Sequence, residues 1–461
     1  MSKPGPISKV SIVGMGKLGA CMVAGMASRG FSVICVDVDK RVVEAVNSGR
    51  APVQETGLAE VICANRERIH ATLNYEEAIL GSDISFVIVP TPSDERGAFS
   101  TAYASRAFAE IGRVLARKAA YHVVVLTSTV LPGATRQILL PILERESRKR
   151  CGPDFGLCYG PEFIALGTII RDFLNPDFYL VGEFDARSGD ALEAVNSRVS
   201  LNQARSKRMS IENAELAKIA INGYVTLKIS YANMLSDICE KLPGGDIDVV
   251  SDALGMDSRI GRKYLTGGFG FGGPCFPRDN LALSFIGEKL GADCSIPRAN
   301  DAFNHSISQR SIAKLGGFFH KGQNVAVLGL AFKPQSHVIE ESPGIFLCRA
   351  LADAGHRVIG HDPLANDAAR STLGERAVIV DDIRDCLRDA EVILITTPDA
   401  AFAALTPADY LGANKSITVI DFWRLMSKKL ENHPRIRYVP IGRCIDDGAA
   451  IAGLARVWEA D

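Results

Sequence analysis

One cysteine stands inside an unusually glycine-rich segment, residues 267–280, which reads GGFGFGGPCFPRDN. A thiol is nucleophilic as the thiolate, and a nearby cation or the amide groups of a helix start favour that form. The run Pro277, Arg278 and Asp279 after Cys275 is typical of a helix start, and the glycines allow a ligand to approach the main chain. Cys275 is therefore a candidate nucleophile. Taken alone, the segment fits a glycine-rich surface loop with an incidental cysteine equally well.

A second set of polar residues lies in residues 210–239, a stretch of uninterrupted helical propensity. Lys218 and Asn222 are four residues apart, so they share one face of the predicted helix, and Glu215 lies one turn before them. The remaining residues are largely Ala, Ile, Leu and Val. The pair is either solvated or points into a polar cavity, and its apolar surroundings favour the cavity.

The N-terminal part carries a GxGxxG motif at residues 14–19, between a predicted strand at 10–13 and an apolar helical pattern. A second predicted strand, 31–36, ends at Asp37. This context is what a dinucleotide site needs: a tight turn, a helix N-terminus under the pyrophosphate, and a carboxylate for the ribose. Because no basic residue directly follows Asp37, we expect NAD rather than NADP. The predicted cofactor residues of this motif are Gly14, Gly16, Lys17, Leu18, Gly19 and Asp37.

Further predicted strands at 84–89 and 123–126 end in turns that carry Thr91 and Thr129. Ligands of open α/β sheets bind beyond the carboxyl ends of strands, so both turns are expected to line the nicotinamide end of the cofactor. Caps of the following helices are the alternative interpretation. Glu162 follows the next predicted strand, where a surface carboxylate is the alternative.

Length and composition limit the class of protein. A chain of 461 residues predicts two or three domains, and a formal net charge of −1 gives no reason to expect nucleic acid or a membrane surface as a partner. The eleven cysteines form no CxxC pair, which argues against a disulfide framework or a metal site. The N-terminus lacks an apolar signal region, and no apolar run reaches the length of a membrane span. We expect a soluble cytoplasmic protein.

Residues 324–329 restart the N-terminal pattern, because VAVLG parallels VSIVG and LADAGHRVIGHDP parallels MASRGFSVICVDV. The second copy has Leu330–Pro334 where the first has its glycines, so it suits a base and a diphosphate instead. The predicted fold is α/β, with two Rossmann-like doubly wound parallel sheets joined by a central helical segment. The predicted domains are 1–207 (NAD-binding), 208–312 (helical, with the cysteine loop) and 313–461 (Rossmann-like, with a nucleotide-like ligand).

The chain resembles the UDP-glucose/GDP-mannose dehydrogenase family over roughly residues 9–445. The motifs that carry the resemblance are SIVGMGKLG, VPTPSD, TSTVLPG, YGPEF, AELAKIAIN, SRIGRKYL, GFGFGGPCFPRD and GLAFKP. The resemblance implies oxidation of a sugar C6 alcohol to a carboxylate with two NAD. Cys275 would capture the intermediate aldehyde as a thiohemiacetal and then carry a thioester.

Roles for the other residues also follow from the resemblance. Lys218 and Asn222 would stabilise negative charge on the C6 oxygen. Asp279 would assist proton transfer, Thr129 would help place the water, and Glu162 would act as a base in the later steps. Arg259 would reach the sugar nucleotide across a homodimer. Cofactor contacts would include Arg278, and the remaining predicted substrate contacts are Phe163, Ile164, Tyr264, Gly272, Phe332, Lys333 and Arg424.

Several positions depart from the family pattern. Leu166 stands where a second glutamate is frequent, Glu340 replaces an arginine near the cofactor, and Arg278 replaces a lysine. The segment 421–424, DFWR, stands where a DGR-like segment is expected. These departures predict a divergent branch of the family.

Several functions compatible with these residues stay open. UDP-glucose is the favoured substrate over GDP-mannose, and PEF rather than PER at Glu162-Phe163 weighs against a UDP-N-acetylhexosamine. A two-electron hydroxy-acid dehydrogenase would have no use for Cys275. A non-catalytic nucleotide-sugar-binding protein would explain Leu166 and Glu340, but it would not explain why Cys275 and Lys218 are present together.

Overall fold

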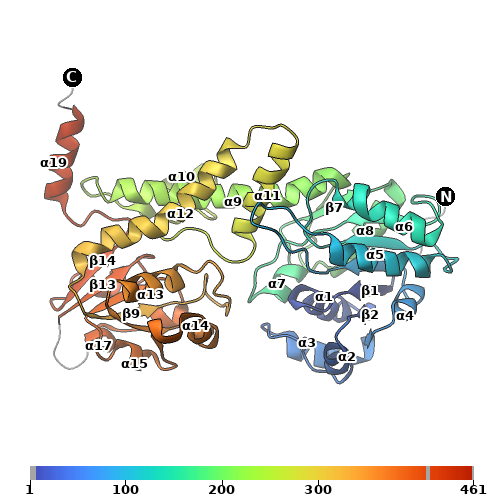
Figure 1. Cartoon of the computed structure of the whole chain (residues 1–461), viewed down its shortest axis with the longest axis horizontal. Helices are drawn as coiled ribbons and strands as arrows, with labels where there is room; N and C mark the ends of the chain where they lie inside the picture. Colours follow the sequence, from blue (N-terminus) through green and yellow to red (C-terminus); the bar gives the residue numbers. More distant parts are fainter. Residues whose placement is uncertain (1–6, 412–415, 459–461) are drawn as a thin grey trace. The chain divides into compact units, whose positions relative to one another are not determined.

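The computed structural model describes residues 7–411 and 416–458, which divide into two compact units (Figure 1). The first unit comprises Met1–Ile221 and Phe285–Gly291, and the second comprises Asn222–Ser284 and Ala292–Asp461. Each unit contains one predominantly parallel sheet. The predicted fold class, two Rossmann-like sheets with a helical segment between them in the chain, is confirmed.

The first unit is built on an eight-stranded sheet of order β3-β2-β1-β4-β5-β6-β7-β8. Its neighbouring strands are parallel, apart from the antiparallel pair β6 and β7. The strands are β1 (Lys9–Val13), β2 (Ser32–Val36), β3 (Ile69–Thr72), β4 (Ile84–Val87), β5 (Val123–Leu126), β6 (Gly156–Tyr159), β7 (Tyr179–Glu183) and β8 (Ser206–Ser210). Residues of β4, β5 and β6 are buried throughout, because helices cover both faces of such a sheet.

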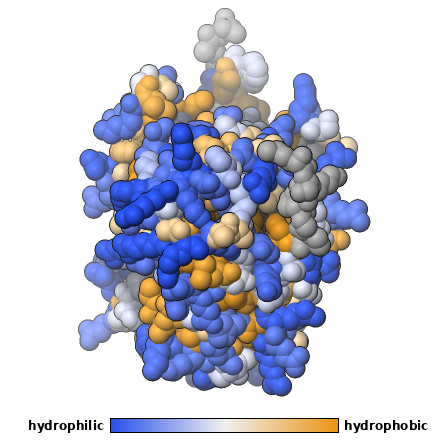
Figure 2. All heavy atoms as spheres, turned by 90° about the vertical axis from the view of Figure 1, so that its right-hand side faces the viewer, coloured by the Kyte–Doolittle hydropathy of each residue, from blue (hydrophilic) through white to orange (hydrophobic). Residues whose placement is uncertain are grey.

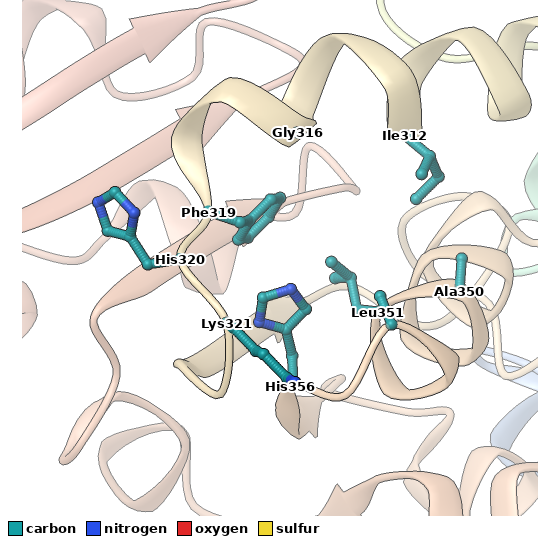
Figure 3. Close-up of a pocket in the computed structure, with 9 residues that line it drawn as sticks. Ile312, Gly316, Phe319, His320, Lys321, Ala350, Leu351 and His356 are labelled. Atoms are coloured by element: carbon teal, nitrogen blue, oxygen red, sulfur yellow. The ribbon is translucent and has the colours of Figure 1, made fainter.

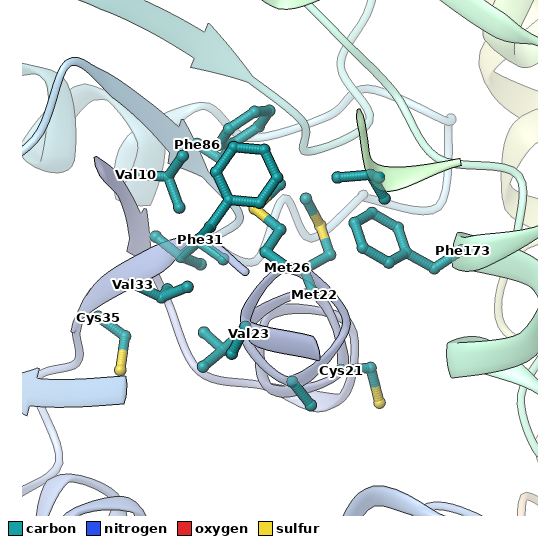
Figure 4. Packing of buried hydrophobic residues seen from close by; sticks show 14 of the residues in the cluster. Val10, Cys21, Met22, Val23, Met26, Phe31, Val33, Cys35, Phe86 and Phe173 are labelled. Atoms are coloured by element: carbon teal, nitrogen blue, oxygen red, sulfur yellow. The ribbon is translucent and has the colours of Figure 1, made fainter. Parts of the chain in front are cut away.

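The helices of this unit pack on the sheet through apolar faces. They are α1 (Lys17–Ser28), α2 (Lys40–Asn47), α3 (Leu58–Ala64), α4 (Tyr75–Leu80), α5 (Ala102–Leu115), α6 (Leu140–Ser147), α7 (Ile169–Leu174) and α8 (Ala186–Val199), with short turns η1 (Arg66–Arg68) and η2 (Thr135–Leu139). Figure 4 shows the core around α1, where Met22 and Met26 lie beside Phe31 and Phe173. Gly25 allows this packing, because a Cβ there would lie 2.6 Å from the Phe173 ring. This core fixes the position of the turn before α1.

The second unit is built on a six-stranded parallel sheet of order β11-β10-β9-β12-β13-β14. Its strands are β9 (Asn324–Leu328), β10 (Arg357–His361), β11 (Val378–Ile379), β12 (Val392–Ile395), β13 (Ile417–Asp421) and β14 (Ile436–Pro440). Its helices are α10 (Ile247–Met256), α12 (Ser295–Leu315), α13 (Pro343–Asp353), α14 (Asn366–Leu373), α15 (Ile383–Leu387), α16 (Ala400–Ala403), α17 (Pro407–Leu411), α18 (Ser427–Leu430) and α19 (Asp447–Trp458), with short turns η3 (Gly316–Phe318) and η4 (Gly374–Arg376).

Two helices belong partly to each unit: α9 (Ile211–Cys239) and α11 (Phe276–Lys289). The long helix and the helix start after Cys275 agree with the sequence predictions. Pro243 and Gly244 (φ +66°) lie after the end of α9, and Asp246 caps a new helix, α10. Gly291 (φ +74°) likewise lies between α11 and α12.

The internal repeat is confirmed by the strand order, because β3-β2-β1-β4-β5 corresponds to β11-β10-β9-β12-β13. Gly14 and Gly329 both adopt positive φ at the end of the first strand of their sheet. A Cβ on Gly19 would lie 1.9 Å from the carbonyl oxygen of Gly14, and one on Gly344 would lie 2.1 Å from that of Gly329. The second copy thus keeps the close contact between strand and helix, but a longer loop, residues 330–342, separates them.

Hydrophilic residues cover most of the face seen in Figure 2, with smaller apolar patches between them. In the described part of the chain, no helix has the length and apolar character needed to cross a membrane. The described residues also include no group of three or more His, Cys, Asp or Glu side chains able to hold a metal ion.

Candidate active site

The turn between β1 and α1 has the geometry of a dinucleotide site. Gly14 has φ +100°, and a Cβ there would lie 2.1 Å from the carbonyl oxygen of Ile88. Among the described residues, and apart from the glycine and its two chain neighbours, no atom lies within 4 Å of a Cβ built on Gly16. The main chain is therefore open at this position, just before α1 begins. Such an opening at a helix N-terminus accommodates a pyrophosphate. The residues of this turn therefore fit a bound dinucleotide.

Asp37 at the end of β2 is oriented by main-chain groups. Its Oδ2 accepts a 2.7 Å hydrogen bond from the Met15 amide, and its Oδ1 accepts one of 2.9 Å from the Asp39 amide. The residue is half-buried, so its carboxylate can still accept from ribose hydroxyls. The nearby basic side chains of Lys40 and Arg41 pair with Glu44 and with Asp39. This arrangement suits NAD, whose ribose carries no 2′-phosphate.

The turns after β4 and β5 are joined by hydroxyl groups. Thr91 Oγ1 donates to the Thr129 carbonyl oxygen at 2.7 Å. Ser128 Oγ donates to the Val89 carbonyl oxygen at 2.7 Å and accepts from the Val89 amide at 2.9 Å. The structure thus brings the two predicted residues Thr91 and Thr129 together at the carboxyl edge of the first sheet.

Glu162 lies in the segment after β6, next to Lys218 of α9. The Lys218 Nζ donates to the Glu162 carbonyl oxygen at 2.7 Å and lies 4.3 Å from the centre of the Phe163 ring. Burial of the carboxyl group raises the pKa of Glu162 to about 8, although the Lys218 ammonium opposes this effect. A carboxyl group with such a pKa can exchange protons near neutral pH. Ile164 and Leu166 pack against the core of the first unit.

In the second unit, Asn222, Asp279 and Arg278 form one hydrogen-bonded group. Asn222 Nδ2 donates to Asp279 Oδ2 at 2.7 Å, and Arg278 Nη2 donates to Asp279 Oδ1 at 3.1 Å. Asp279 is only 1% exposed. Cys275 is exposed, precedes α11 directly, and its carbonyl oxygen accepts from the Asp279 amide at 2.9 Å. The N-terminus of α11 favours negative charge near this position.

The glycines before Cys275 are packed against protein atoms. A Cβ on Gly270 would lie 2.2 Å from Asn304 Oδ1, and one on Gly272 would lie 2.2 Å from the Glu341 carbonyl oxygen. Gly273 has φ +77°, and its Cβ would lie 2.5 Å from the Phe332 ring. Within the second unit, these glycines allow the loop to pack closely against its neighbours. Approach of a ligand to this loop stays a prediction.

Three other predicted ligand residues of this unit are accessible. Lys333 lies near the Phe332 ring, with 5.8 Å between its Nζ and the ring centre. Tyr264 is half-exposed and has φ +68°, and its ring meets the Phe276 ring edge to face. Arg259 is exposed in the turn after α10, where it pairs with Asp257. Contact of these residues with a sugar nucleotide stays a prediction.

Arg424 has a different environment from the other predicted ligand residues, because its side chain is buried. Its guanidinium group donates twice to Asp248, once to the Gly267 carbonyl oxygen, and once each to the Phe422 and Ile441 carbonyl oxygens. A guanidinium has five N–H donors, so all of them have protein acceptors. A ligand contact by Arg424 would require one of these hydrogen bonds to break.

Glu215 is a residue whose role the sequence did not reveal. It is fully buried on α9, where Oε2 accepts from the Gly133 amide at 2.6 Å and Oε1 from the Thr135 amide at 2.9 Å. Glu215 thereby ties α9 to the turn that follows Thr129. The only signal in the sequence is a glutamate one turn before Lys218 within an apolar helix.

The second unit also has a cavity of about 280 Å³, shown in Figure 3. It lies between the ends of α12 and α13 and is lined by apolar side chains and by His320, Lys321 and His356. These residues precede β9 and β10, so the cavity lies at the amino edge of the sheet. Phe332 and Lys333 follow β9, at the carboxyl edge, and none of the predicted site residues lines the cavity.

Comparison with protein families matches three consecutive parts of the chain to one family. Residues 8–200 match the NAD binding domain of the UDP-glucose/GDP-mannose dehydrogenase family, 212–306 match its central domain, and 326–428 match its UDP binding domain.

Individual proteins resemble the chain over almost its whole length. UDP-glucose 6-dehydrogenase AglM of Haloferax volcanii is 36% identical over 425 residues, which cover 91% of this chain and 98% of that protein. GDP-mannose 6-dehydrogenase of Pseudomonas putida is 31% identical over 435 residues, covering 91% of this chain and 97% of that protein. The solved structure of a UDP-glucose dehydrogenase from Pyrobaculum islandicum is 31% identical, with a TM-score of 0.84 and coverage of 96% of this chain and 100% of that one.

Proposed function

Because this chain belongs to the UDP-glucose/GDP-mannose dehydrogenase family, whose members are NAD-dependent oxidoreductases acting on CH–OH donors, we propose that it oxidises the C6 alcohol of UDP-glucose to the carboxylate. The reaction would pass through intermediates on Cys275. The observation that carries the proposal is the placement of Cys275 at the start of α11, beside the hydrogen-bonded group of Asn222, Arg278 and Asp279. Bound NAD supplies the hydride acceptor.

The first step is loss of hydride from C6, which oxidises the alcohol to an aldehyde. Lys218 and Asn222, four residues apart on α9, would provide an ammonium and an amide donor for the C6 oxygen. Glu162 and Asp279 are the groups available to take up the alcohol proton. Glu162 is suited to this exchange, because its pKa is raised to about 8.

The aldehyde must stay bound until the second oxidation. Addition of the Cys275 thiolate to its carbonyl carbon forms a C–S bond and, after protonation, a thiohemiacetal. Loss of a second hydride and one proton converts the thiohemiacetal to a thioester. Water then adds to the thioester carbon, the C–S bond breaks, and the products are the carboxylate and the regenerated thiol. Thr129 would help to place this water.

The stoichiometry of the reaction tests the proposal. Purified protein is incubated with NAD and with UDP-glucose, GDP-mannose or UDP-N-acetylhexosamines, and the NADH formed per sugar consumed is measured. The proposal expects two NADH per UDP-glucose. One NADH per sugar would indicate a two-electron dehydrogenase, and none with any sugar would indicate a binding protein without turnover.

The role of the thiol is tested by Cys275→Ser. We expect kcat to fall by roughly 10³-fold or more, because no thioester can form, while the Kd for NAD stays unchanged. Cys63→Ser is the matched control, because Cys63 is also exposed but lies on α3 of the first unit. Unchanged turnover of Cys275→Ser would remove the sulfur from the mechanism.

GDP-mannose is the second candidate substrate. The chain is about as similar to several GDP-mannose 6-dehydrogenases as to the UDP-glucose 6-dehydrogenases of Bacillus subtilis and Rhizobium meliloti, at 30–32% identity. The higher identity to the Haloferax volcanii enzyme and the match to a UDP binding domain support UDP-glucose. The substrate panel above distinguishes the two by their kcat/KM values.

The surface of α9 supports a homodimer as the assembled form. Exposed apolar side chains recur along one side of this helix: Leu216, Tyr224, Tyr231, Met234 and Ile238. Such a stripe is typical of a helix that packs against a partner, and Arg259 would then be available to the partner's substrate. A cytoplasmic location is supported by the eight buried cysteines, which a reducing compartment preserves as thiols.

A further inference from the structure

The loop that carries Cys275 is held by side-chain amides from two helices. Asn233 of α9 accepts from the Gly268 amide at 2.9 Å and donates to the Phe269 carbonyl oxygen at 2.9 Å. Asn304 of α12 accepts from the Phe271 amide at 2.8 Å and donates to the Phe271 carbonyl oxygen at 2.9 Å. Each amide therefore holds one N–H and one carbonyl group of the loop backbone.

The two asparagines are themselves fixed. Asn233 is buried and uses its second N–H on the carbonyl oxygen of Ile229, one turn earlier on α9. Asn304 is half-buried, and its Oδ1 occupies the space that a Cβ on Gly270 would fill. At the end of the loop, the Gly273 amide donates to the Glu340 carbonyl oxygen at 3.0 Å. The backbone is thus held up to two residues before Cys275.

We propose that Asn233 and Asn304 are positioning residues for Cys275. A glycine-rich loop has high conformational entropy, so it needs such restraints to hold a reacting atom in place. The two asparagine amides restrain the loop through its backbone, because its glycines have no side chains by which it could be held. Misplacement of a reacting group by about 1 Å can cost roughly 10²-fold in rate. This inference rests on the proposed role of Cys275.

The test replaces each asparagine by aspartate in the full-length protein. Aspartate keeps an acceptor for the loop amide, but it places an oxygen opposite the loop carbonyl, where the asparagine donated. The matched control is Asn47→Asp, because Asn47 makes the same pair of hydrogen bonds, both of 2.8 Å, to Ala71 in the first unit.

The main readout is the alkylation ratio, which is the rate at which iodoacetamide alkylates Cys275 divided by the rate for the exposed Cys63. Both rates are measured by mass spectrometry of the two cysteine-containing peptides. Loss of one neutral hydrogen bond corresponds to about a fivefold shift between the held and the released loop. We expect the ratio to fall by about that factor in Asn304→Asp and Asn233→Asp, because a released Cys275 loses its fixed place at the start of α11. Asn47→Asp should leave the ratio unchanged.

Kinetics provide the second readout. In both loop variants kcat should fall by roughly 10- to 100-fold while KM for NAD stays constant. An unchanged alkylation ratio in both variants would overturn the inference, whatever happens to their stability. If Asn233→Asp fails to fold, the milder Asn304→Ser decides, because Asn304 is only half-buried. If the wild type turns over no nucleotide sugar, the proposed function fails, and the alkylation ratio still decides whether the loop is held.

Discussion

At the scale of single residues, the Glu162 carboxyl group has the clearest electrostatic signature in the candidate site. Its desolvation raises its pKa to about 8, and the positive charge of Lys218 lowers this pKa only in part. The Lys218 ammonium donates to the main-chain carbonyl of Glu162, so it stays close whether the carboxyl group is charged or neutral. The sequence predicted both residues as part of the site, but it could not predict this pKa, which depends on burial by segments far apart in the chain.

The pKa of Glu162 makes the activity dependent on pH. If the carboxylate acts as a base, the rate must rise with pH up to about pH 8. In Glu162→Gln we expect a lower kcat without this rise, measured as a kcat–pH profile from pH 6 to 9.5. If the kcat–pH profile of Glu162→Gln keeps the wild-type midpoint near pH 8, this midpoint does not belong to the Glu162 carboxyl group.

The same pKa predicts an effect on stability. The pKa is higher in the folded protein than the ordinary value of 4.5, so the folded state holds the proton more tightly between pH 4.5 and 8. The contribution of Glu162 to the free energy of unfolding is therefore complete below pH 4.5 and is lost as the pH rises to 8. Urea unfolding of wild type and Glu162→Gln at pH 5 and pH 8 measures it, and the wild type should lose more stability over this range.

At the scale of elements, α9 carries a row of buried or half-buried polar groups. Its members follow the helical period: Glu215, Lys218, Asn222, Thr226 and Asn233. Each contacts a different segment: the turn after Thr129, the segment after β6, Asp279, Asn300 of α12, and the cysteine loop. Glu215 and Lys218 thus hold segments of the first unit, and the other three side chains hold segments of the second unit.

The start of this row gives a direct test of stability. In Glu215→Gln one carboxylate oxygen becomes an NH₂ group facing a main-chain N–H, so a buried donor loses its acceptor. We expect a loss of about 1–3 kcal/mol in the free energy of unfolding, measured in urea.

Glu212→Gln is the matched control on the same helix. Glu212 forms a partly exposed ion pair with Arg136, and its replacement should change the free energy of unfolding by less than about 1 kcal/mol. Equal losses in the two variants would contradict the role given to Glu215.

The sequence predicted the elements better than their contacts. The long helix was located to within one residue at its start, because its propensity is uninterrupted and a serine precedes it. Lys218 and Asn222 were predicted to share a face because helical spacing is local. Asn233 and Asn304 were missed, because their partners lie more than thirty residues away and an asparagine in a helix gives no hint of them. For Arg424, the pattern predicted a ligand contact and could not reveal its five protein acceptors.

At the scale of the whole chain, the two copies of the fold differ in the groups that surround the aspartate after their second strand. The aspartate at the end of the second strand is present in both, as Asp37 and Asp362. Asp37 accepts two main-chain hydrogen bonds and is half-buried. Asp362 is 3% exposed and accepts four, from the amides of residues 330, 331, 364 and 365. The Asp362 carboxylate is therefore fully engaged in holding a loop, whereas the Asp37 carboxylate keeps free acceptor capacity for the predicted ribose contact.

Replacement of the aspartate by asparagine should therefore mainly lower stability at Asp362 and mainly weaken NAD binding at Asp37. Asp362→Asn turns one acceptor oxygen into a donor facing main-chain amides, so we expect a loss of roughly 3 kcal/mol in the free energy of unfolding and an unchanged Kd for NAD. Asp37→Asn loses fewer internal hydrogen bonds, but it removes the charged partner of the ribose, so its Kd for NAD should rise about tenfold or more with a smaller loss of stability. Urea unfolding and NAD titration of both variants measure the two effects. A higher Kd for NAD in Asp362→Asn, or an unchanged Kd for NAD in Asp37→Asn, would contradict the different roles given to the two aspartates. The matched Asp→Asn change separates ligand binding from loop support, because Asp37 and Asp362 occupy the same place in the strand order and differ only in the groups that surround them.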